Sequence, residues 1–249
     1  MKSYRVLAAI GVFSLLLTVQ ASAAEIKVFV STAAKSMLDQ LGPDFEKASG
    51  HKLNVSAGPA ADLKQKIDQG APFDVAILTT PLIDALAKAG KIDAASRVTV
   101  ARAGLGVSVQ SGAAKPDVST DAALKNALLN AKSIGYNGVG ASKAANEAMF
   151  EKLGISDAVR PKVKLLDVSA PIAVAKGDVE IGLGPISEIL PVAGVQFVGA
   201  YPSDVQSYLV FSAGLSSATE DTGAAKALID FLTSPAAVPV IKAKGMEPG

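Results

Sequence analysis

Short apolar runs alternate with amphipathic stretches along the first third of the chain, which is the pattern of β-strands alternating with helices. Strands are predicted at 26–30, 53–55 and 73–78, and a helix is predicted after each of them. A glycine follows each helix, where a left-handed backbone is favoured. This order predicts an α/β fold with a mainly parallel sheet. The first helix places Met37, Leu38, Leu41 and Phe45 on one face, the second covers 60–69, and the third has Thr80 as N-cap and Pro81 at its first position.

The remainder of the chain repeats this alternation after a long strand-like stretch at 98–109. Gly104 and Gly106 lie inside that stretch, and glycine inside a strand marks a bend or a close backbone approach. The sequence has neither an internal repeat nor a low-complexity linker, so two intimately joined domains are expected. Further strands are predicted at 133–135, 163–166, 181–183, 195–198 and 208–212, and helices at 120–130, 141–152, 170–175, 224–233 and 235–244.

The N-terminus has the three parts of a secretory signal peptide. Lys2 and Arg5 provide positive charge, an apolar run follows at 6–17, and Ala21-Ser22-Ala23 provides the small residues of a cleavage site. A membrane-spanning helix would need about 20 apolar residues, so a cleaved signal peptide is favoured over a membrane anchor. We therefore expect residues 1–23 to be removed after Ala23 and the mature protein to lie in a bacterial periplasm.

Composition narrows the possible functions. Of the 249 residues, 49% are hydrophobic and 19% are charged, which is enough apolar content for a packed core. The formal net charge of +1 provides no basic face for nucleic acid. The chain has no cysteine and a single histidine, His51, which excludes disulfides, thiolate metal sites, cysteine nucleophiles and multi-histidine metal sites. Neither a metal nor a cofactor is expected.

Five segments distributed over the mature chain carry a family signal: IKVFVSTAAKSML (26–38), LKQKIDQGAPFDVAILT (63–79), AKSIGYN (131–137), KGDVEIGLGPISEIL (176–190) and ALIDFLTSPAAVPVIKAKGM (227–246). Together with the order of elements, they resemble the type II periplasmic solute-binding proteins of ABC transporters, most closely the molybdate-binding-protein-like branch. The resemblance implies a two-lobed fold with two crossover segments and a ligand cleft between the lobes.

The same resemblance implies how the chain is divided. Lobe one would comprise 24–103 plus 210–249, lobe two would comprise 104–209, and the crossovers would lie at 102–109 and 207–214. Gly104, Gly106 and Gly214 fall in these crossovers, where a hinge must absorb backbone rotation. A packing or turn role for these glycines stays open as the alternative.

Helices of this fold begin at the carboxyl edge of the sheet and direct their first N–H groups into the cleft. Each helix start offers unpaired N–H groups and about half a positive charge, which suits an anion. Three such starts can be identified in the sequence. They are Ser31-Thr32-Ala33, the turn at 58–61 with Gly58, Ala60 and Ala61, and Gly140-Ala141-Ser142.

The resemblance leaves two ligand classes open. In the molybdate branch, serine hydroxyls of the first two turns and a tyrosine of lobe two contact the oxyanion, whereas this chain has Ala33, Ala60 or Ala61, and Pro185 there. Each missing hydrogen bond to a charged ligand would cost roughly 1.5–3 kcal/mol. Arg102, at the start of the first crossover, could instead bind a carboxylate through two guanidinium nitrogens. The remaining polar lining would come from Tyr136, Asn137, Ser142 and Ser187.

These features favour a non-catalytic receptor that captures a small anion, an organic carboxylate or a molybdate-like oxyanion, and delivers it to an ABC permease in the inner membrane. We expect a monomer that binds no nucleic acid. One alternative is an exported hydrolase of the serine/threonine–lysine type, which would use Thr32 and Lys35. Another is a ligand-binding partner of a sensor protein. Nucleophile-elbow, zinc-protease and Walker A motifs are all missing from the sequence, so no catalytic residue is assigned.

Overall fold

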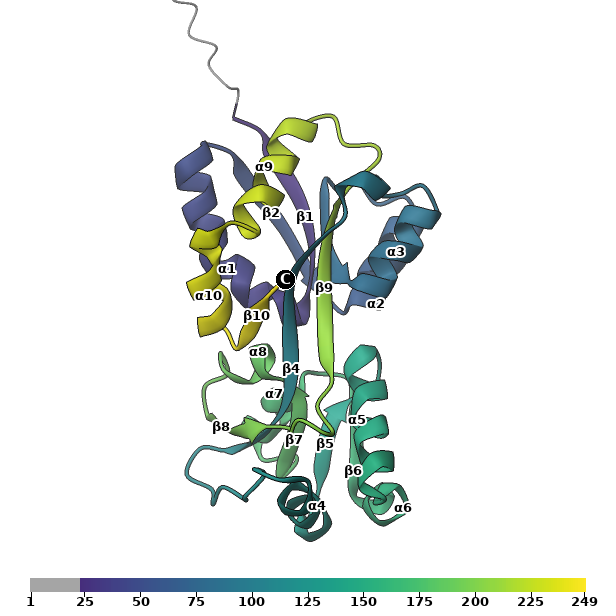
Figure 1. Cartoon of the computed structure of the whole chain (residues 1–249), viewed down its shortest axis with the longest axis vertical. Helices are drawn as coiled ribbons and strands as arrows, with labels where there is room; N and C mark the ends of the chain where they lie inside the picture. Colours follow the sequence, from purple (N-terminus) through teal and green to yellow (C-terminus); the bar gives the residue numbers. More distant parts are fainter. Residues whose placement is uncertain (1–22) are drawn as a thin grey trace, which may run out of the picture.

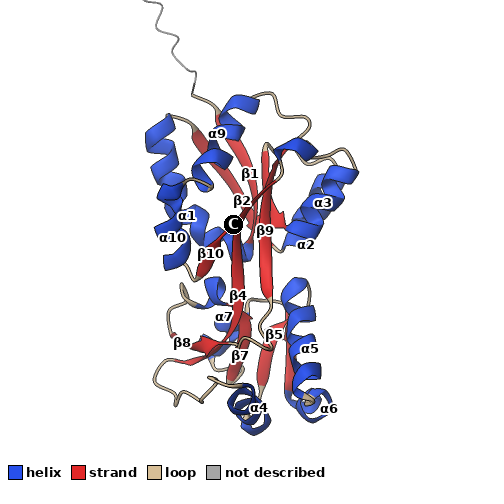
Figure 2. Ribbon diagram, viewed as in Figure 1, coloured by secondary structure: helices blue, strands red, loops and turns tan. Residues whose placement is uncertain are grey.

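Residues 23–249 are described by the computed structural model, and they form two lobes stacked along the longest axis of the molecule (Figure 1). Lobe one, at the top of Figure 1, contains both ends of the described chain, and lobe two contains its middle part. The expected signal peptide lies outside the described residues except for Ala23. Strands in both lobes run roughly along the long axis, with helices packed beside them (Figure 2).

The sheet of lobe one begins with three parallel strands in the order β2-β1-β3. The central strand β1 is buried on both faces, because Val28 and Val30 pack into one hydrophobic cluster and Phe29 packs into another on the opposite side. This explains why the strand is an almost continuous apolar run. The elements are β1 (Glu25–Ser31), α1 (Thr32–Ser49), β2 (Lys52–Gly58), α2 (Ala60–Asp68), β3 (Val75–Thr79), α3 (Thr80–Lys88), α9 (Thr222–Leu232) and α10 (Val238–Ala243).

Lobe two has its own parallel strands, with β5 between β6 and β7. Its hydrophobic cluster is separate from those of lobe one and is closed by α4 and α5 through Leu124, Leu128, Met149 and Phe150. Each lobe is therefore folded around a core of its own. The elements are α4 (Asp121–Asn130), β5 (Ile134–Asn137), α5 (Ala141–Leu153), α6 (Ser156–Val159), β6 (Val163–Leu166), α7 (Ala170–Lys176), β7 (Ile181–Pro185), α8 (Ile186–Ile189) and β8 (Val195–Ala200).

Two long strands join the lobes. β4 (Val98–Gln110) pairs with β9 (Tyr208–Leu215) as far as Gly104, and from Leu105 onwards it pairs with β7 and β8. All of these pairings are antiparallel. β4 leaves lobe one, and β9 returns to it. The predicted parallel order therefore describes the outer strands of each lobe, and the crossover strands add an antiparallel centre.

The crossover glycines differ in their surroundings. A Cβ at Gly106 would lie 2.7 Å from the Phe197 ring and 2.9 Å from a backbone oxygen, and a Cβ at Gly214 would lie 2.6 Å from Ile92. At Gly104 the nearest atoms are 3.4 Å away, which is ordinary contact. Close packing thus accounts for Gly106 and Gly214, while Gly104 lies where β4 changes partners.

Most of the predicted elements are present, and the differences concern short segments. α6 and β10 (Met246–Pro248) were not predicted, and the predicted helix at 235–244 consists of a 3-10 turn followed by α10. The prediction that Thr80 caps α3 is wrong, because Thr79 is the N-cap. The Thr80 hydroxyl instead lies 2.8 Å from the hydroxyl of Ser212 on β9.

Within residues 23–249, no single helix combines the length and apolar composition needed to span a membrane. α9 with the 235–243 segment passes that test only as a pair bent by 52°.

Candidate functional site

The strand directions bring the carboxyl edges of both sheets to the boundary between the lobes. β4 runs into lobe two, β9 returns antiparallel to it, and β3 is antiparallel to β9, so β1, β2 and β3 end towards lobe two. β7 is antiparallel to β4, so β5, β6 and β7 end towards lobe one. Helices that follow these strands begin at the boundary, with their unpaired N–H groups towards it. They are α1, α2 and α3 from lobe one and α5, α7 and α8 from lobe two.

The start of α1 in lobe one is enclosed by protein. Ser31 is its N-cap, yet the Ser31 side chain makes no capping hydrogen bond. Only 3% of Ser31 is exposed, and its Oγ has no hydrogen-bond partner within the described residues. Ala33 is buried and Thr32 is exposed. A buried hydroxyl without a partner is costly, so it marks a position where a bound group would be stabilised.

The start of α2 lies beside that of α1, because Ser31 and Gly58 are direct partners in the β1–β2 pairing. Pro59 is the N-cap of α2, and the first turn contains the exposed Asp62 together with Ala60 and Ala61. Proline has no N–H to donate, and a carboxylate in the first turn repels an anion. This turn is thus a weaker anion site than the sequence predicts.

The start of α5 in lobe two is exposed and depends on glycine. Gly140, its N-cap, has φ 84° and ψ −172°, a backbone conformation that residues other than glycine rarely adopt. The Asn137 side chain accepts a 2.9 Å hydrogen bond from the N–H of Val139, so it holds the loop. Ser142 is partly buried in the first turn. The turn has the geometry of an anion site, with Asn137 as a local support.

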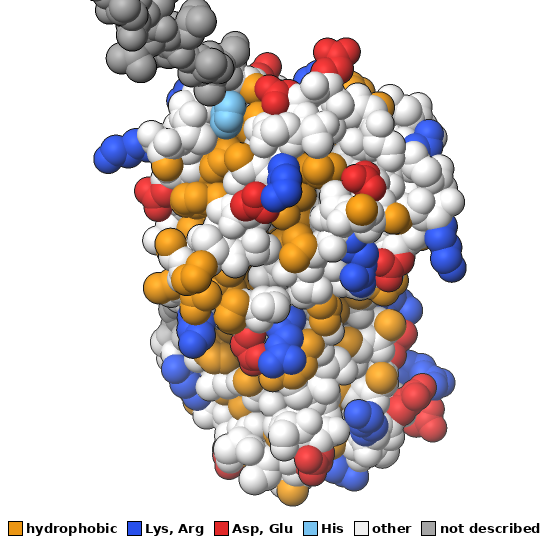
Figure 3. All heavy atoms as spheres, turned by 45° about the horizontal axis from the view of Figure 1, so that its top comes forward, with side chains coloured by type: hydrophobic (Ala, Val, Ile, Leu, Met, Phe, Trp, Pro, Cys, Tyr) orange, Lys and Arg blue, Asp and Glu red, His pale blue; other side chains and the backbone are white. Residues whose placement is uncertain are grey.

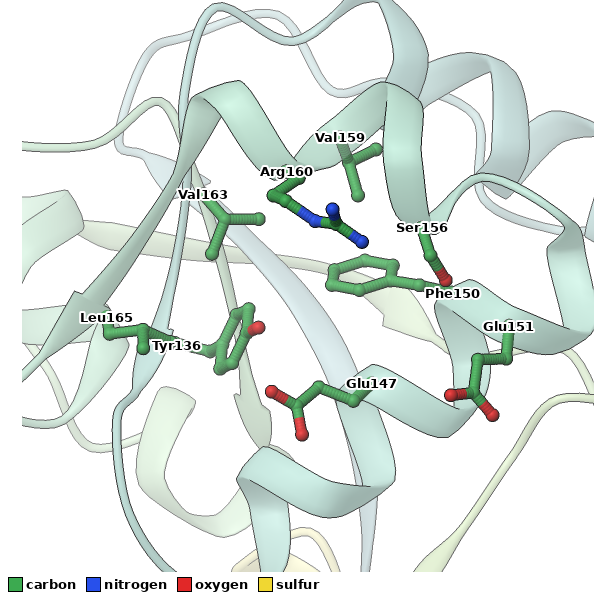
Figure 4. A pocket seen from close by; sticks show the side chains of 9 residues that line it. All are labelled: Tyr136, Glu147, Phe150, Glu151, Ser156, Val159, Arg160, Val163 and Leu165. Atoms are coloured by element: carbon green, nitrogen blue, oxygen red, sulfur yellow. The ribbon is translucent and has the colours of Figure 1, made fainter.

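Tyr136 does not lie with the three turns. It is 3% exposed, and its ring centroid lies 5.9 Å from that of Phe150 inside lobe two. Burial, with a smaller contribution from the Glu147 charge, raises the pKa of Tyr136. Its ring lines a cavity of about 420 Å³ beside α5 (Figure 4). The structure thus places the Tyr136 ring inside lobe two, beside Phe150.

Ser187 connects the lobes. It is 2% exposed and its hydroxyl donates a 2.7 Å hydrogen bond to the carbonyl oxygen of Ala33. The donor comes from α8 in lobe two and the acceptor from the first turn of α1 in lobe one. Because that hydrogen is already used, Ser187 holds α1 in place and does not offer a free donor to a ligand.

Arg102 is already paired. Its Nε donates to Glu247 Oε2 at 2.7 Å, a second guanidinium nitrogen contacts the same oxygen, and the guanidinium lies 4.8 Å from the centre of the Tyr208 ring. Glu247 belongs to β10, which pairs with β4. The Arg102 guanidinium is thus held by Glu247 and Tyr208 in this structure and is not the free group that the sequence predicts. Lys and Arg side chains are interspersed with Asp and Glu over the face shown in Figure 3.

The Thr32–Lys35 pair lacks the arrangement that a hydrolase would need. Lys35 Nζ forms an ion pair with Asp39 Oδ2 at 2.6 Å along the same helix. The Lys35 ammonium is thus engaged by Asp39, and no hydrogen bond joins it to the Thr32 hydroxyl within the described residues. The hydrolase alternative thereby loses its supporting feature.

Two further sets of hydrogen bonds, one made by Gln206 and one joining Ser169 to Glu188, were not predicted from the sequence. The Gln206 side chain accepts from the N–H of Leu105 at 2.8 Å and donates to the Leu105 carbonyl at 3.0 Å, tying the second crossover to the first. Partly buried Glu188 accepts a 2.6 Å hydrogen bond from Ser169, just before α7, and burial raises the pKa of Glu188. The sequence Ser-Ala-Pro at 169–171 is typical of a helix start, and it was the one sequence feature that could have drawn attention to Ser169.

Comparisons with known proteins agree with this architecture. A family model described as bacterial extracellular solute-binding protein matches residues 26–247. The molybdate-binding protein ModA of Azotobacter vinelandii is 32% identical over 242 residues, covering 92% of each chain. Aconitate isomerase of a Pseudomonas species is 26% identical over 227 residues, covering 89% of this chain and 87% of that protein.

The solved periplasmic molybdate-binding protein of Azotobacter vinelandii superposes with a TM-score of 0.77 at 22% identity, covering 90% of this chain and 99% of that chain. This likeness shows the type II periplasmic binding protein fold. With a family model that matches nearly all of the described residues, the chain belongs to the bacterial extracellular solute-binding protein family and is similar to its molybdate-binding members.

Proposed function

We propose that this protein is the monomeric substrate-binding component of an ABC importer in the periplasm, and that it holds a small anion between its lobes. The observation that carries the proposal is the convergence of helix starts from both lobes at one boundary, with the unpartnered Ser31 hydroxyl at the α1 start. N–H groups of the α1 turn and of the Gly140–Ser142 turn would bind opposite sides of the anion. Lobes comprising 24–103 plus 210–249 and 104–209 would close around it.

An organic carboxylate is the ligand class that we favour, with a molybdate-like oxyanion second. Ala33, Ala60, Ala61 and Pro185 provide no side-chain hydrogen bonds where the molybdate branch has hydroxyls. Each absent donor costs a charged ligand roughly 1.5–3 kcal/mol. The relative from Pseudomonas is named for aconitate, which is a carboxylate. Arg102 adds little to this preference, because two of its guanidinium nitrogens contact Glu247 and the guanidinium also lies over the Tyr208 ring.

Thermal unfolding of the mature protein against a ligand panel tests the proposal. The panel contains molybdate, tungstate and sulfate on one side, and citrate, the two aconitate isomers, malonate and benzoate on the other. A ligand present at about 100 times its Kd should add about 2.7 kcal/mol to the free energy of unfolding. Stabilisation by any member supports anion capture, and the member that acts identifies the class. No stabilisation by any of them would overturn the proposal.

Isomerisation of a carboxylate is a second candidate function, and it rests on the similarity to the Pseudomonas aconitate isomerase. The mature protein would be incubated with cis-aconitate and the solution followed by proton NMR. Appearance of trans-aconitate above a protein-free control would establish an enzyme. Binding without conversion would leave the receptor function alone.

A further inference from the structure

A cavity of about 420 Å³ lies within lobe two, away from the α1 and α2 turns. It is bounded by α5, by the segment 156–160 and by β6, which is the outermost strand of the sheet. Because no strand follows β6, the cavity opens at the side of the lobe. Volumes of about 300–1,000 Å³ are typical of small-molecule sites.

The floor of the cavity is apolar. Phe150 and Val159 are 4% and 1% exposed, and Val163 lies beside them. Leu165 on β6 also lines the cavity and is 55% exposed. A ligand with an apolar body would cover Leu165 and release the water around it.

The rim carries charges of both signs. Figure 4 shows the Glu147 carboxylate and the Arg160 guanidinium on opposite sides of the Tyr136 and Phe150 rings. Glu147 pairs with Lys143 at 2.8 Å and Arg160 pairs with Asp157 at 2.8 Å, both on the surface. Such exposed pairs contribute little, so their charges can be redirected to a ligand at small cost.

Two hydroxyls complete the lining. Ser156 Oγ is buried and has no hydrogen-bond partner within the described residues. The Tyr136 hydroxyl, a phenol whose pKa burial raises further, can donate a hydrogen bond. The cavity thus offers an apolar floor, the Arg160 guanidinium, the Glu147 and Glu151 carboxylates and two hydroxyl groups.

We propose that this cavity binds an apolar α-amino acid. The ammonium group would contact Glu147, the carboxylate would contact Arg160, and the apolar side chain would lie on Phe150 and Leu165. This ligand uses both rim charges, whereas an amine or a carboxylate alone would use one. The site is separate from the boundary between the lobes and does not depend on the function proposed there.

Three probes of the same size test the proposal on the mature protein: L-phenylalanine, phenethylamine, which lacks the carboxylate, and 3-phenylpropionate, which lacks the ammonium group. Ligand-observed NMR titrations give the dissociation constants. We expect L-phenylalanine to bind about threefold to fivefold more tightly than either partial probe, the range of an exposed ion pair. Equal affinities for all three probes, or no binding of L-phenylalanine, would overturn the proposal.

Substitutions then assign the two rims. Glu147→Gln should weaken L-phenylalanine and phenethylamine but not 3-phenylpropionate, and Arg160→Gln should do the reverse. Lys176→Gln, at the exposed last residue of α7 and outside the cavity lining, is the matched charge control and should change none of the constants. Weakening of every probe by both substitutions, with unchanged thermal stability, would contradict the assignment.

A variant outside the cavity tests whether L-phenylalanine binds between the lobes instead. Ser31→Ala alters the α1 turn in lobe one and should leave L-phenylalanine binding unchanged. Loss of L-phenylalanine binding in that variant would place the amino acid between the lobes and overturn the cavity assignment.

Discussion

The α1 turn of lobe one and the α5 turn of lobe two face the same boundary but are held in different ways. In the α1 turn, Ser31 and Ala33 are 3% and 6% exposed, and Ser187 of lobe two binds the Ala33 carbonyl. In the α5 turn, Val139 is 59% exposed and Gly140 has a positive φ. Core packing fixes the first turn, whereas local hydrogen bonds and a glycine conformation fix the second.

This difference indicates that the two helix starts would contribute differently to the binding of a ligand. A ligand would first meet N–H groups that are already held in position by lobe one. The exposed loop of lobe two would then contribute its N–H groups with little packing to rearrange. The predictions that follow test whether the two turns differ in this way.

Ser31→Ala should produce the largest effect, on affinity and not on stability. Removing a hydrogen bond to a charged ligand should raise Kd roughly 10- to 100-fold. The free energy of unfolding without ligand should not fall, because the hydroxyl has no partner to lose. Calorimetric titration with the ligand found in the melting screen, plus urea unfolding, measures both. Ser142→Ala in the α5 turn is the control and should change Kd less. An equal change in Kd would show that the two turns do not differ in how they bind the ligand.

Gly140→Ala should lower the free energy of unfolding by about 2 kcal/mol, because a Cβ is strained in this backbone region. No atom lies within 4 Å of the added methyl, so steric collision would not contribute. Gly184→Ala is the control, since it too has open space but no positive φ. Urea unfolding distinguishes the two. Equal stability of both variants would show that the loop relaxes around the substitution.

Ser187→Ala should lower the free energy of unfolding by about 1 kcal/mol, because α8 loses its hydrogen bond to the Ala33 carbonyl. It should also weaken ligand binding, since that carbonyl belongs to the α1 turn. Ser217→Ala, an exposed serine outside the boundary, is the control. If Ser187→Ala lowers stability but leaves Kd unchanged, the inter-lobe bond serves folding and not the site.

Glu188→Gln should have the smallest effect and a defined pH dependence. Burial raises the pKa of Glu188, so ionising it destabilises the folded wild type as pH rises through the folded-state pKa. The variant should melt at a higher temperature than wild type at about pH 8, and the difference should disappear below the ordinary value of 4.5. Melting curves across this range measure it. A constant difference at all pH values would rule out titration of Glu188.

Long elements could be predicted because their apolar residues follow the period of a strand or a helix. The continuous run at Val28–Val30 and the helical spacing of Met37, Leu41 and Phe45 each identify one element. β10 is too short to show a period, so the sequence does not indicate it. β10 forms because Met246 and Pro248 meet β4 in the folded chain.

By itself, the sequence determined the α/β alternation and two of the boundary turns, since Ser31 and Gly140 each lie between a predicted strand and a predicted helix. Only the tertiary structure decided what the polar side chains do. Arg102 meets Glu247 across 145 positions, and Ser187 meets Ala33 across 154. Local patterns encode local elements, but a hydrogen-bond partner that far along the chain is chosen by how the lobes pack.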